Sequence, residues 1–288
     1  MKRLAGDFVY EMSKSKEPAL EIKPGDKLQV ETPDAFGGQI ESPQDTLADL
    51  DMSRINPATG PVYVASASPG DTLVLKIEEI EVKSPGVQGI VPGFGFLQDE
   101  YDQSMVTTHK IDQEGIEFDG FTLPVKPMIG TIGVAPPEEP VPCNTPGRHG
   151  GNLDTPEIRA GATLYLPVFH EGGLFALGDG HALQGDGEVC GVAIEVATTT
   201  TLEVGLLGEK METPMVQVND EIIFLGSGKT ISEAGKKALK AMIKYLEKET
   251  SLSSSQAYKF CSVACDMKIS QVVNPQKTVR VSVNKKLL

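Results

Sequence analysis

Apolar and polar residues alternate in several stretches of the chain, at the period of a β-strand with one buried face. The clearest stretch follows a turn at residues 69–71, and its apolar positions are Leu73, Leu75, Ile77, Ile80 and Val82. A similar turn and strand occupy residues 22–32, and a weaker repeat occupies residues 160–168. Such repetition predicts strands that re-enter their sheets at similar corners. The pattern therefore favours a mainly β protein with a sandwich or barrel-like body over alternating strands and helices.

The pattern changes to helical spacing towards the C-terminus. Residues 230–233 (TISE) form a capping box, which predicts the start of a helix. Apolar residues then follow at helical spacing, namely Ile231, Ala234, Ala238, Leu239, Met242, Ile243 and Leu246. We expect a second helix over residues 253–265 and a closing strand over residues 278–283. The chain thus divides into a mainly β body, residues 1–206, which carries the active-site loops, and a smaller α+β section, residues 207–288, packed on that body.

Composition narrows the range of partners. The 288 residues carry a net charge of −14, and 40% of them are hydrophobic. The hydrophobic content argues against disorder, and the negative charge disfavours a nucleic acid or an anionic membrane as partner. No apolar run reaches the ~18 residues of a spanning helix, and the charged N-terminal segment lacks an apolar signal core. The four cysteines show no metal-finger spacing, so we expect free thiols in a cytoplasmic protein.

Glycines and chemically active side chains are concentrated in two segments that we expect to be loops. The longer one, residues 172–195, places five such side chains close together, namely Asp179, His181, Gln184, Asp186 and Glu188. The shorter one, residues 148–154, reads RHGGNLD. Glycine lets a backbone turn sharply and approach a ligand closely. We therefore expect the two segments to converge on one site.

Histidine nitrogen and carboxylate oxygen together suit a divalent first-row ion, zinc above all. The candidate ligands are His149, Asp154, Asp179 and His181. A catalytic zinc ion would keep one position open for water and lower the pKa of that water to about 7. An all-oxygen calcium site formed by Asp179, Asp186 and Glu188 is the alternative.

Other polar side chains of these segments are candidates for catalytic roles. Glu188 is the first choice as general base and Asp186 the second, because a carboxylate can take a proton from water and pass it to a leaving amine. Asn152 and Gln184 are candidates for holding a carbonyl oxygen on which negative charge develops.

Several of these residues also have a plain structural interpretation. His149 could be a loop histidine bonded to Asp154, and Asp179 and Asp186 could be turn formers beside glycine. Cys190 lies in an apolar alternating run, where a thiol is usually a small buried hydrophobe, and nearby carboxylates would raise its pKa. A cysteine hydrolase that uses Cys190 is therefore a lesser alternative.

Five separated motifs give the sequence a family resemblance. They are NPATGPVYV (56–64), IGTIGVAP (129–136), HGGNLD (149–154), LGDGHALQGDGE (177–188) and SQVVNP (270–275). In this order they resemble the acetamidase/formamidase family, and the likeness covers nearly the whole chain. The resemblance implies hydrolysis of short linear amides to carboxylate and ammonia, by a mainly β enzyme that is commonly oligomeric and is thought to bind a divalent metal.

From this resemblance we expect a small neutral amide as substrate and a homodimer as the assembly. We also expect four residues to narrow the pocket around a small acyl group, namely Phe94, Phe96, Leu97 and Met128. A non-catalytic β-sandwich that binds a metal or a small ligand is the alternative, because one scaffold supports many functions.

Overall fold

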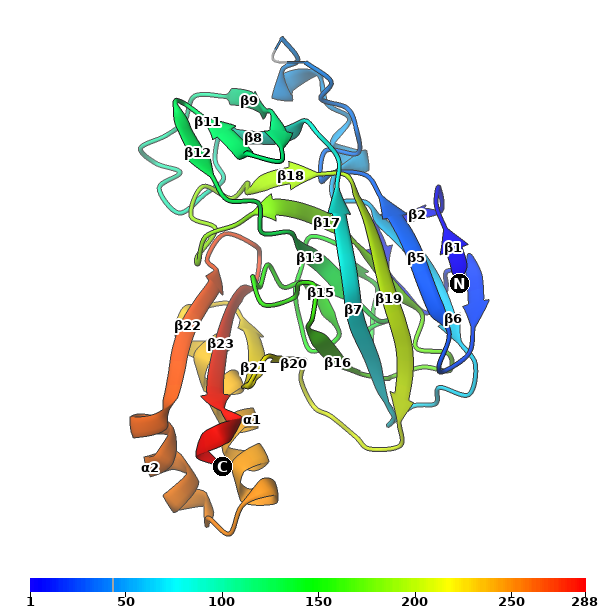
Figure 1. The fold of residues 1–288 in the computed structure, drawn as a ribbon, viewed down its shortest axis with the longest axis vertical. Coiled ribbons are helices and arrows are strands. Elements are labelled where there is room, and N and C mark those ends of the chain that lie inside the picture. The colour runs from blue at the N-terminus through cyan, green and yellow to red at the C-terminus, as the bar shows by residue number, and fades with distance from the viewer. Residues whose placement is uncertain (43) are drawn as a thin grey trace.

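The computed structural model describes residues 1–42 and 44–288, and these residues contain two nine-stranded sheets (Figure 1). In spatial order the first sheet consists of β1 (Lys2–Leu4), β5 (Lys27–Thr32), β19 (Thr198–Leu207), β7 (Thr72–Val82), β16 (Thr163–Pro167), β20 (Met215–Val218), β21 (Glu221–Gly228), β23 (Lys277–Asn284) and β22 (Cys265–Gln271). The main path of the second sheet is β15 (Gly150–Asn152), β13 (Met128–Gly133), β17 (Phe175–Leu183), β18 (Ile194–Val196), β8 (Gly86–Ile90) and β9 (Met105–His109).

The remaining strands and short helices extend this framework. Strand β6 (Ala58–Val64) pairs with β17 and also with β2 (Phe8–Val9) and β4 (Leu20–Ile22). A small antiparallel sheet contains β10 (Ile111–Asp112), β11 (Gly115–Phe118) and β12 (Phe121–Leu123), and a strand pair joins β3 (Glu11–Met12) to β14 (Val141–Pro142). The 3-10 helices are η1 (Leu47–Asp49), η2 (Met52–Arg54) and η3 (Lys285–Leu287).

The two sheets contribute to one apolar core. Strand β7 buries alternate side chains, among them Leu73, Leu75 and Ile77, as its sequence pattern predicts. Side chains of the second sheet, including Ile132 and Phe175, belong to the same core. The prediction of a mainly β, sandwich-like body is confirmed.

Two helices pack on the far end of the first sheet. Helix α1 (Ile231–Glu249) buries Ala234, and it buries Ala238, Met242 and Leu246 in a cluster with side chains of β21 and β23. Its start is fixed by Thr230, whose side chain accepts a hydrogen bond from the backbone of Glu233. Helix α2 (Ser254–Ala264) follows, and Figure 1 shows both helices at the end of the molecule away from β8 and β9.

Both predicted helices and the closing strand are present. Because β20 pairs with β16, the C-terminal strands continue the first sheet, and the division of the chain at residue 206 stays a prediction. All four cysteines are free, as expected. Among the described helices, none is long and apolar enough to cross a membrane.

Candidate active site

The two glycine-bearing segments lie on opposite sides of one strand of the second sheet. Strand β13 pairs with β15, where Thr131 is opposite Asn152, and also with β17, where Thr131 is opposite Gly178. The segments are therefore neighbours in space. They are not loops throughout, because Asp179 and His181 belong to β17. Being two positions apart on a strand, these two side chains point to the same face of the sheet.

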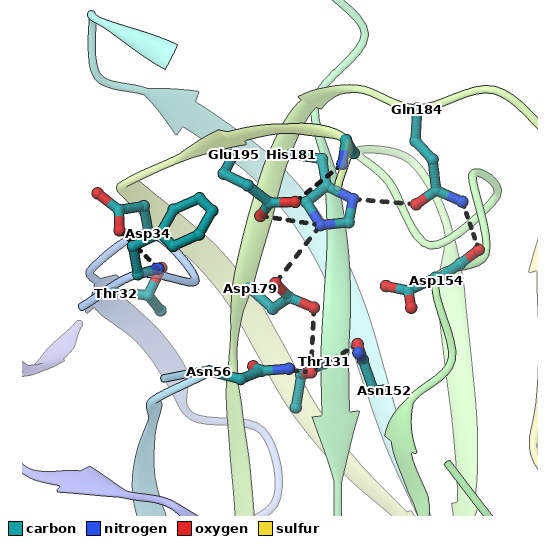
Figure 2. Close-up of polar contacts among 12 residues, drawn as sticks. Thr32, Asp34, Asn56, Thr131, Asn152, Asp154, Asp179, His181, Gln184 and Glu195 are labelled. Atoms are coloured by element: carbon teal, nitrogen blue, oxygen red, sulfur yellow. Dashed lines mark hydrogen bonds and ion pairs between the residues drawn. The ribbon is translucent and has the colours of Figure 1, made fainter. Parts of the chain in front are cut away.

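His181 is at the centre of a buried cluster of carboxylates (Figure 2). Its Nε2 atom lies 3.2 Å from Glu195 Oε2 and 3.5 Å from Asp179 Oδ1. One donor atom from each of Asp179, His181 and Glu195 lies within 4.8 Å of the others. The same holds for Asp154, His181 and Glu188, so the two groups share the imidazole.

Gln184 fixes the tautomer of this imidazole. Its Nε2 group donates to the backbone carbonyls of Asp154 (2.7 Å) and Ser270 (3.3 Å), and carbonyls only accept. The Oε1 atom of Gln184 must then face His181 Nδ1, at 2.9 Å, and Nδ1 is the donor (Figure 2). In the neutral ring, the lone pair therefore lies on Nε2, which faces Asp179 and Glu195.

Three of these carboxylates stand on backbone in the left-handed region. The φ angles are 43° at Asp154, 57° at Asp179 and 45° at Glu188, values that residues other than glycine rarely adopt. The packing beneath them requires glycine at position 130, because a Cβ atom there would lie 2.6 Å from both Asp154 Oδ1 and Asp179 Oδ2. Backbone strain of this kind is concentrated at functional sites.

Burial changes the protonation of the cluster. It raises the pKa of Asp154 and of Glu195 to about 7 and the pKa of Glu188 well above its usual range, and neighbouring carboxylates add to each shift. For His181, burial lowers the pKa, but the charges of Glu195 and Asp179 outweigh burial and raise it. Four buried carboxylates beside one imidazole favour the binding of a cation, since buried charge is costly unless it is paired.

Three buried atoms of the cluster form no hydrogen bond with the described residues, namely Asp154 Oδ1, His181 Nε2 and Glu195 Oε2, although the last two face each other as an ion pair at 3.2 Å. Unsatisfied polar atoms are rare in protein interiors and call for an explanation. Carboxylate oxygen and imidazole nitrogen are the ligands that zinc and other first-row divalent ions take. The residues present thus fit a divalent metal ion.

His149 and Asp186, which the sequence also suggests, lie outside both groups. His149 is buried with its ring against Gly147 and Gly151, and burial lowers its pKa to about 4. The side chain of Asp186 is 51% exposed and forms an ion pair of 2.6 Å with Arg280.

A cavity of about 550 Å³ reaches the cluster. Its polar and charged side chains at the cluster are Asn56, Asn152, Asp179, Glu188, Glu195 and Asn274. Asn152 Oδ1 accepts a hydrogen bond of 2.8 Å from the Thr131 hydroxyl, which leaves its Nδ2 group as a donor. Gln184 is not among the described lining residues and contacts His181 instead.

Of the four residues expected to narrow the pocket, only Phe94 is among the described lining residues. Phe96 (59% exposed) and Leu97 (50% exposed) are exposed to solvent, and Met128 is buried on β13 opposite His181, outside the described lining. Burial raises the pKa of Cys190, which weakens it as a nucleophile, and Cys190 is not among the lining residues described.

Sequence reasoning missed Glu195 and Asn274. Glu195 lies within an apolar run that is typical of an ordinary strand, but β18 places it directly opposite His181. Asn274 donates a hydrogen bond of 2.5 Å to Asp154 Oδ2. A single acidic residue in an apolar β-run is the signal that could have identified Glu195, because a buried carboxylate needs a partner.

Arg280 connects the segment around Asp186 to the C-terminal strands. Its guanidinium is buried and contacts Glu157 (3.0 Å), Asp186 (2.6 Å) and the carbonyl of Ile269 (3.1 Å). The carbonyl of Ser270 accepts a hydrogen bond from the Gln184 side chain. Strand β22, which carries Ile269 and Ser270, therefore also supports the residue that orients the imidazole.

We expect the substitution Arg280→Met to destabilise the fold by about 2 kcal/mol. Breaking a buried ion pair costs more than this, but the exposure of Asp186 reduces the effect. Urea denaturation measures the free energy of unfolding. Lys286→Met is the matched control, since its ion pair with Asp220 is exposed and should leave stability unchanged. Equal stability of the two variants would contradict the assigned role.

Known proteins resemble this chain in both sequence and structure. The sequence profile of the Acetamidase/Formamidase family matches residues 15–143 and 138–286. The structure of an acetamidase from Bacillus halodurans is 39% identical, covers 99% of this chain and 98% of its own, and superimposes with a TM-score of 0.97. An acetamidase from Yersinia enterocolitica is 34% identical, with a TM-score of 0.95 over 99% of this chain and 92% of its own. A formamidase from Methylophilus methylotrophus is 28% identical over 75% of this chain and 70% of its own length.

Proposed function

The chain belongs to the acetamidase/formamidase family and is an amidase that hydrolyses linear amides, and from this premise we propose that the buried cluster around His181 is its catalytic centre and holds a divalent metal ion. The observation that carries the proposal is the group of buried donor atoms from Asp179, His181 and Glu195, which lie within 4.8 Å of one another at the polar end of the cavity. Formamide and acetamide are the proposed test substrates.

Asp179, His181 and Glu195 are the proposed ligands. Their donor atoms lie within 4.8 Å of one another, and the bond of Gln184 to Nδ1 leaves Nε2 of the neutral imidazole as the ligand atom between both carboxylates. An imidazole in the set favours zinc, with calcium as the alternative metal. For an all-oxygen calcium site, Asp186 would have to leave Arg280. When bound, the metal would polarise the amide carbonyl and lower the pKa of a water to about 7.

Glu188 is the proposed general base. It is buried, lines the cavity and lies beside Asp154 in the second group of donor atoms. Its carboxylate would take a proton from the attacking water and return that proton to the amide nitrogen, so that ammonia leaves as a neutral molecule. Two buried carboxylates this close share a proton readily, because both cannot be charged without a high energetic cost.

Asn152 is the proposed donor to the carbonyl oxygen of the substrate. Its Nδ2 group is free for this role because Thr131 holds the Oδ1 atom. A donor placed before the reaction stabilises developing charge without reorganisation. Gln184, expected from sequence to share this role, is proposed instead to orient His181.

Ammonia release tests the proposal. The purified protein is incubated with formamide or acetamide before and after thorough removal of metal by a chelator. We expect ammonia from the untreated protein, none after metal removal, and recovery on addition of zinc. Activity that survives complete metal removal would contradict the metal, and absence of ammonia with every divalent metal would contradict the hydrolase.

A change at Gln184 should weaken metal binding without touching a ligand. We expect Gln184→Leu to lower the affinity for zinc by roughly 10- to 100-fold, since the imidazole loses the partner that fixes its tautomer. Gln184→Glu keeps an acceptor for Nδ1 and should bind more tightly than the leucine variant. Competition with a chromophoric chelator measures both. Equal affinities of the wild type and the leucine variant would count against the orienting role.

We also propose a homodimer in the cytoplasm. The free cysteines suit a reducing compartment. Exposed apolar side chains on α2 and β22, at Tyr258, Val263 and Met267, provide a surface of the kind that subunits bury. Light scattering of the purified protein distinguishes the dimer from a monomer.

A further inference from the structure

The cavity above the cluster is much larger than a formamide or acetamide molecule. Its volume is about 550 Å³. Acetamide has four non-hydrogen atoms, and at roughly 30 Å³ for each water-sized group it would fill roughly a quarter of that space. The remaining volume is walled mainly by apolar side chains, including Phe36, Leu47, Leu50, Ile55, Val91 and Phe94.

These walls are part of the packed structure. Phe36 belongs to a buried apolar cluster with Val192, and Leu47, Leu50 and Ile55 pack against it. The backbone N–H of Phe36 donates to Asp34 Oδ1 at 2.8 Å, which holds the turn that carries the ring. The same turn is tied to the polar end of the cavity, because the backbone N–H of Asn56, a lining residue, donates a hydrogen bond of 2.6 Å to the carbonyl of Ala35.

Phe94, a second aromatic residue of the wall, packs closely against the backbone at Gly191. A Cβ atom at position 191 would lie 2.5 Å from the Phe94 ring, so the ring occupies the space that Gly191 leaves open. The backbone of Phe94 is held in a turn by a 3.0 Å bond to Val91. The apolar wall is therefore formed before a ligand arrives, as binding pockets usually are.

Charge restricts what this space can accept. Within the described lining, the charged side chains are Asp179, Glu188 and Glu195, and no basic side chain is present. An acyl group with its own carboxylate would meet like charge, whereas an apolar acyl group would displace water from an apolar wall.

We propose that the preferred substrates are primary amides with an apolar acyl group of about five or six carbons, or with a phenyl ring. The inference rests on the proposed function, because it assumes that the amide group reacts at the cluster. The amide end lies at the carboxylates and Asn152, and the acyl chain extends along Phe36, Leu50 and Phe94. The small leaving group, ammonia, needs none of the apolar space.

A substrate series tests the proposal. The kcat/KM values of acetamide, butyramide, hexanamide and phenylacetamide are compared with that of succinamate, an amide with a free carboxylate. Each buried methylene should raise kcat/KM about fourfold, so hexanamide should exceed acetamide on the order of a hundredfold. Succinamate should react more slowly than acetamide. Equal or falling values along the series would overturn the proposal while leaving amide hydrolysis intact.

A substitution that fills part of the cavity provides the second test. Leu50→Trp should lower the ratio of kcat/KM for hexanamide to that for acetamide by at least about tenfold, as the indole occupies space for the chain. Leu97→Trp, outside the described lining and exposed, should leave the ratio unchanged. Equal ratios in both variants would overturn the proposal. If no amide is hydrolysed, the proposed function fails, and calorimetric affinities for hexanamide and acetamide then decide whether the cavity binds apolar chains.

Discussion

Replacement of His181 by alanine is expected to lower kcat/KM for acetamide by at least about a thousandfold and to remove the bound metal. The imidazole is the one side chain shared by both groups of donor atoms, and its Nε2 atom has no hydrogen-bond partner among the described residues. Loss of the metal removes both the activation of water and the polarisation of the carbonyl. Metal content by elemental analysis and ammonia release on the same sample measure the two effects together.

His149→Gln is the matched control for this substitution. His149 is a buried histidine from the second glycine-bearing segment, but it belongs to neither group of donor atoms. The variant should keep its metal, and any loss of stability should appear in thermal unfolding rather than in metal content. Loss of metal from the His149 variant and its retention in the His181 variant would reverse the proposed ligand set.

Replacement of Glu188 by glutamine is expected to lower kcat by about 10²- to 10⁴-fold, the range that a positioned general base contributes. Glutamine keeps the size of the side chain and cannot accept the proton. The metal content should remain that of the wild type, because Asp179, His181 and Glu195 are unchanged. Steady-state kinetics with acetamide, together with elemental analysis, separate loss of the base from loss of the metal.

Asp186→Asn is the control for Glu188, because sequence alone suggests either residue as the base. Asp186 is half-exposed and bound to Arg280, and it does not line the cavity as described. We expect its substitution to change kcat only a few-fold, through the position of the segment. A large loss of kcat in the Asp186 variant, with near-normal kcat in the Glu188 variant, would exchange the two assignments.

The fold was predictable from the sequence where one physical signal dominated. Alternation along residues 72–82 predicted β7 because one face of that strand is fully buried. The capping box at Thr230 and the apolar spacing after it predicted the start of α1. The order of strands in each sheet was not predictable, since pairings such as β5 with β19 join residues far apart in the chain.

The candidate site was predictable only in part, for a reason that lies in strand pairing. Asp179, His181, Asp154 and Glu188 were identified by residue type and by the glycines around them. Glu195 was missed because its role depends on lying opposite His181 across two strands, a register that local composition does not reveal. His149 has the right side chain but is enclosed by its own segment, against Gly147 and Gly151.

The residues that line the cavity also could not be predicted from the local sequence. Phe94, Phe96 and Leu97 are close in sequence and equally apolar, yet only Phe94 is among the described lining residues. Exposure of the other two depends on how the segment turns over Gly191. Burial of a given side chain is decided by such long-range contacts, so a pocket lining cannot be inferred from a run of apolar residues.

An anomalous diffraction map from crystals of the active protein tests the central claim most directly. Data collected above and below the zinc absorption edge identify the element and its ligands together. We predict a single strong peak bounded by Asp179 Oδ1, His181 Nε2 and Glu195 Oε2, which disappears in the His181→Ala variant. Crystals of an enzyme that releases ammonia but shows no peak among these atoms would contradict it.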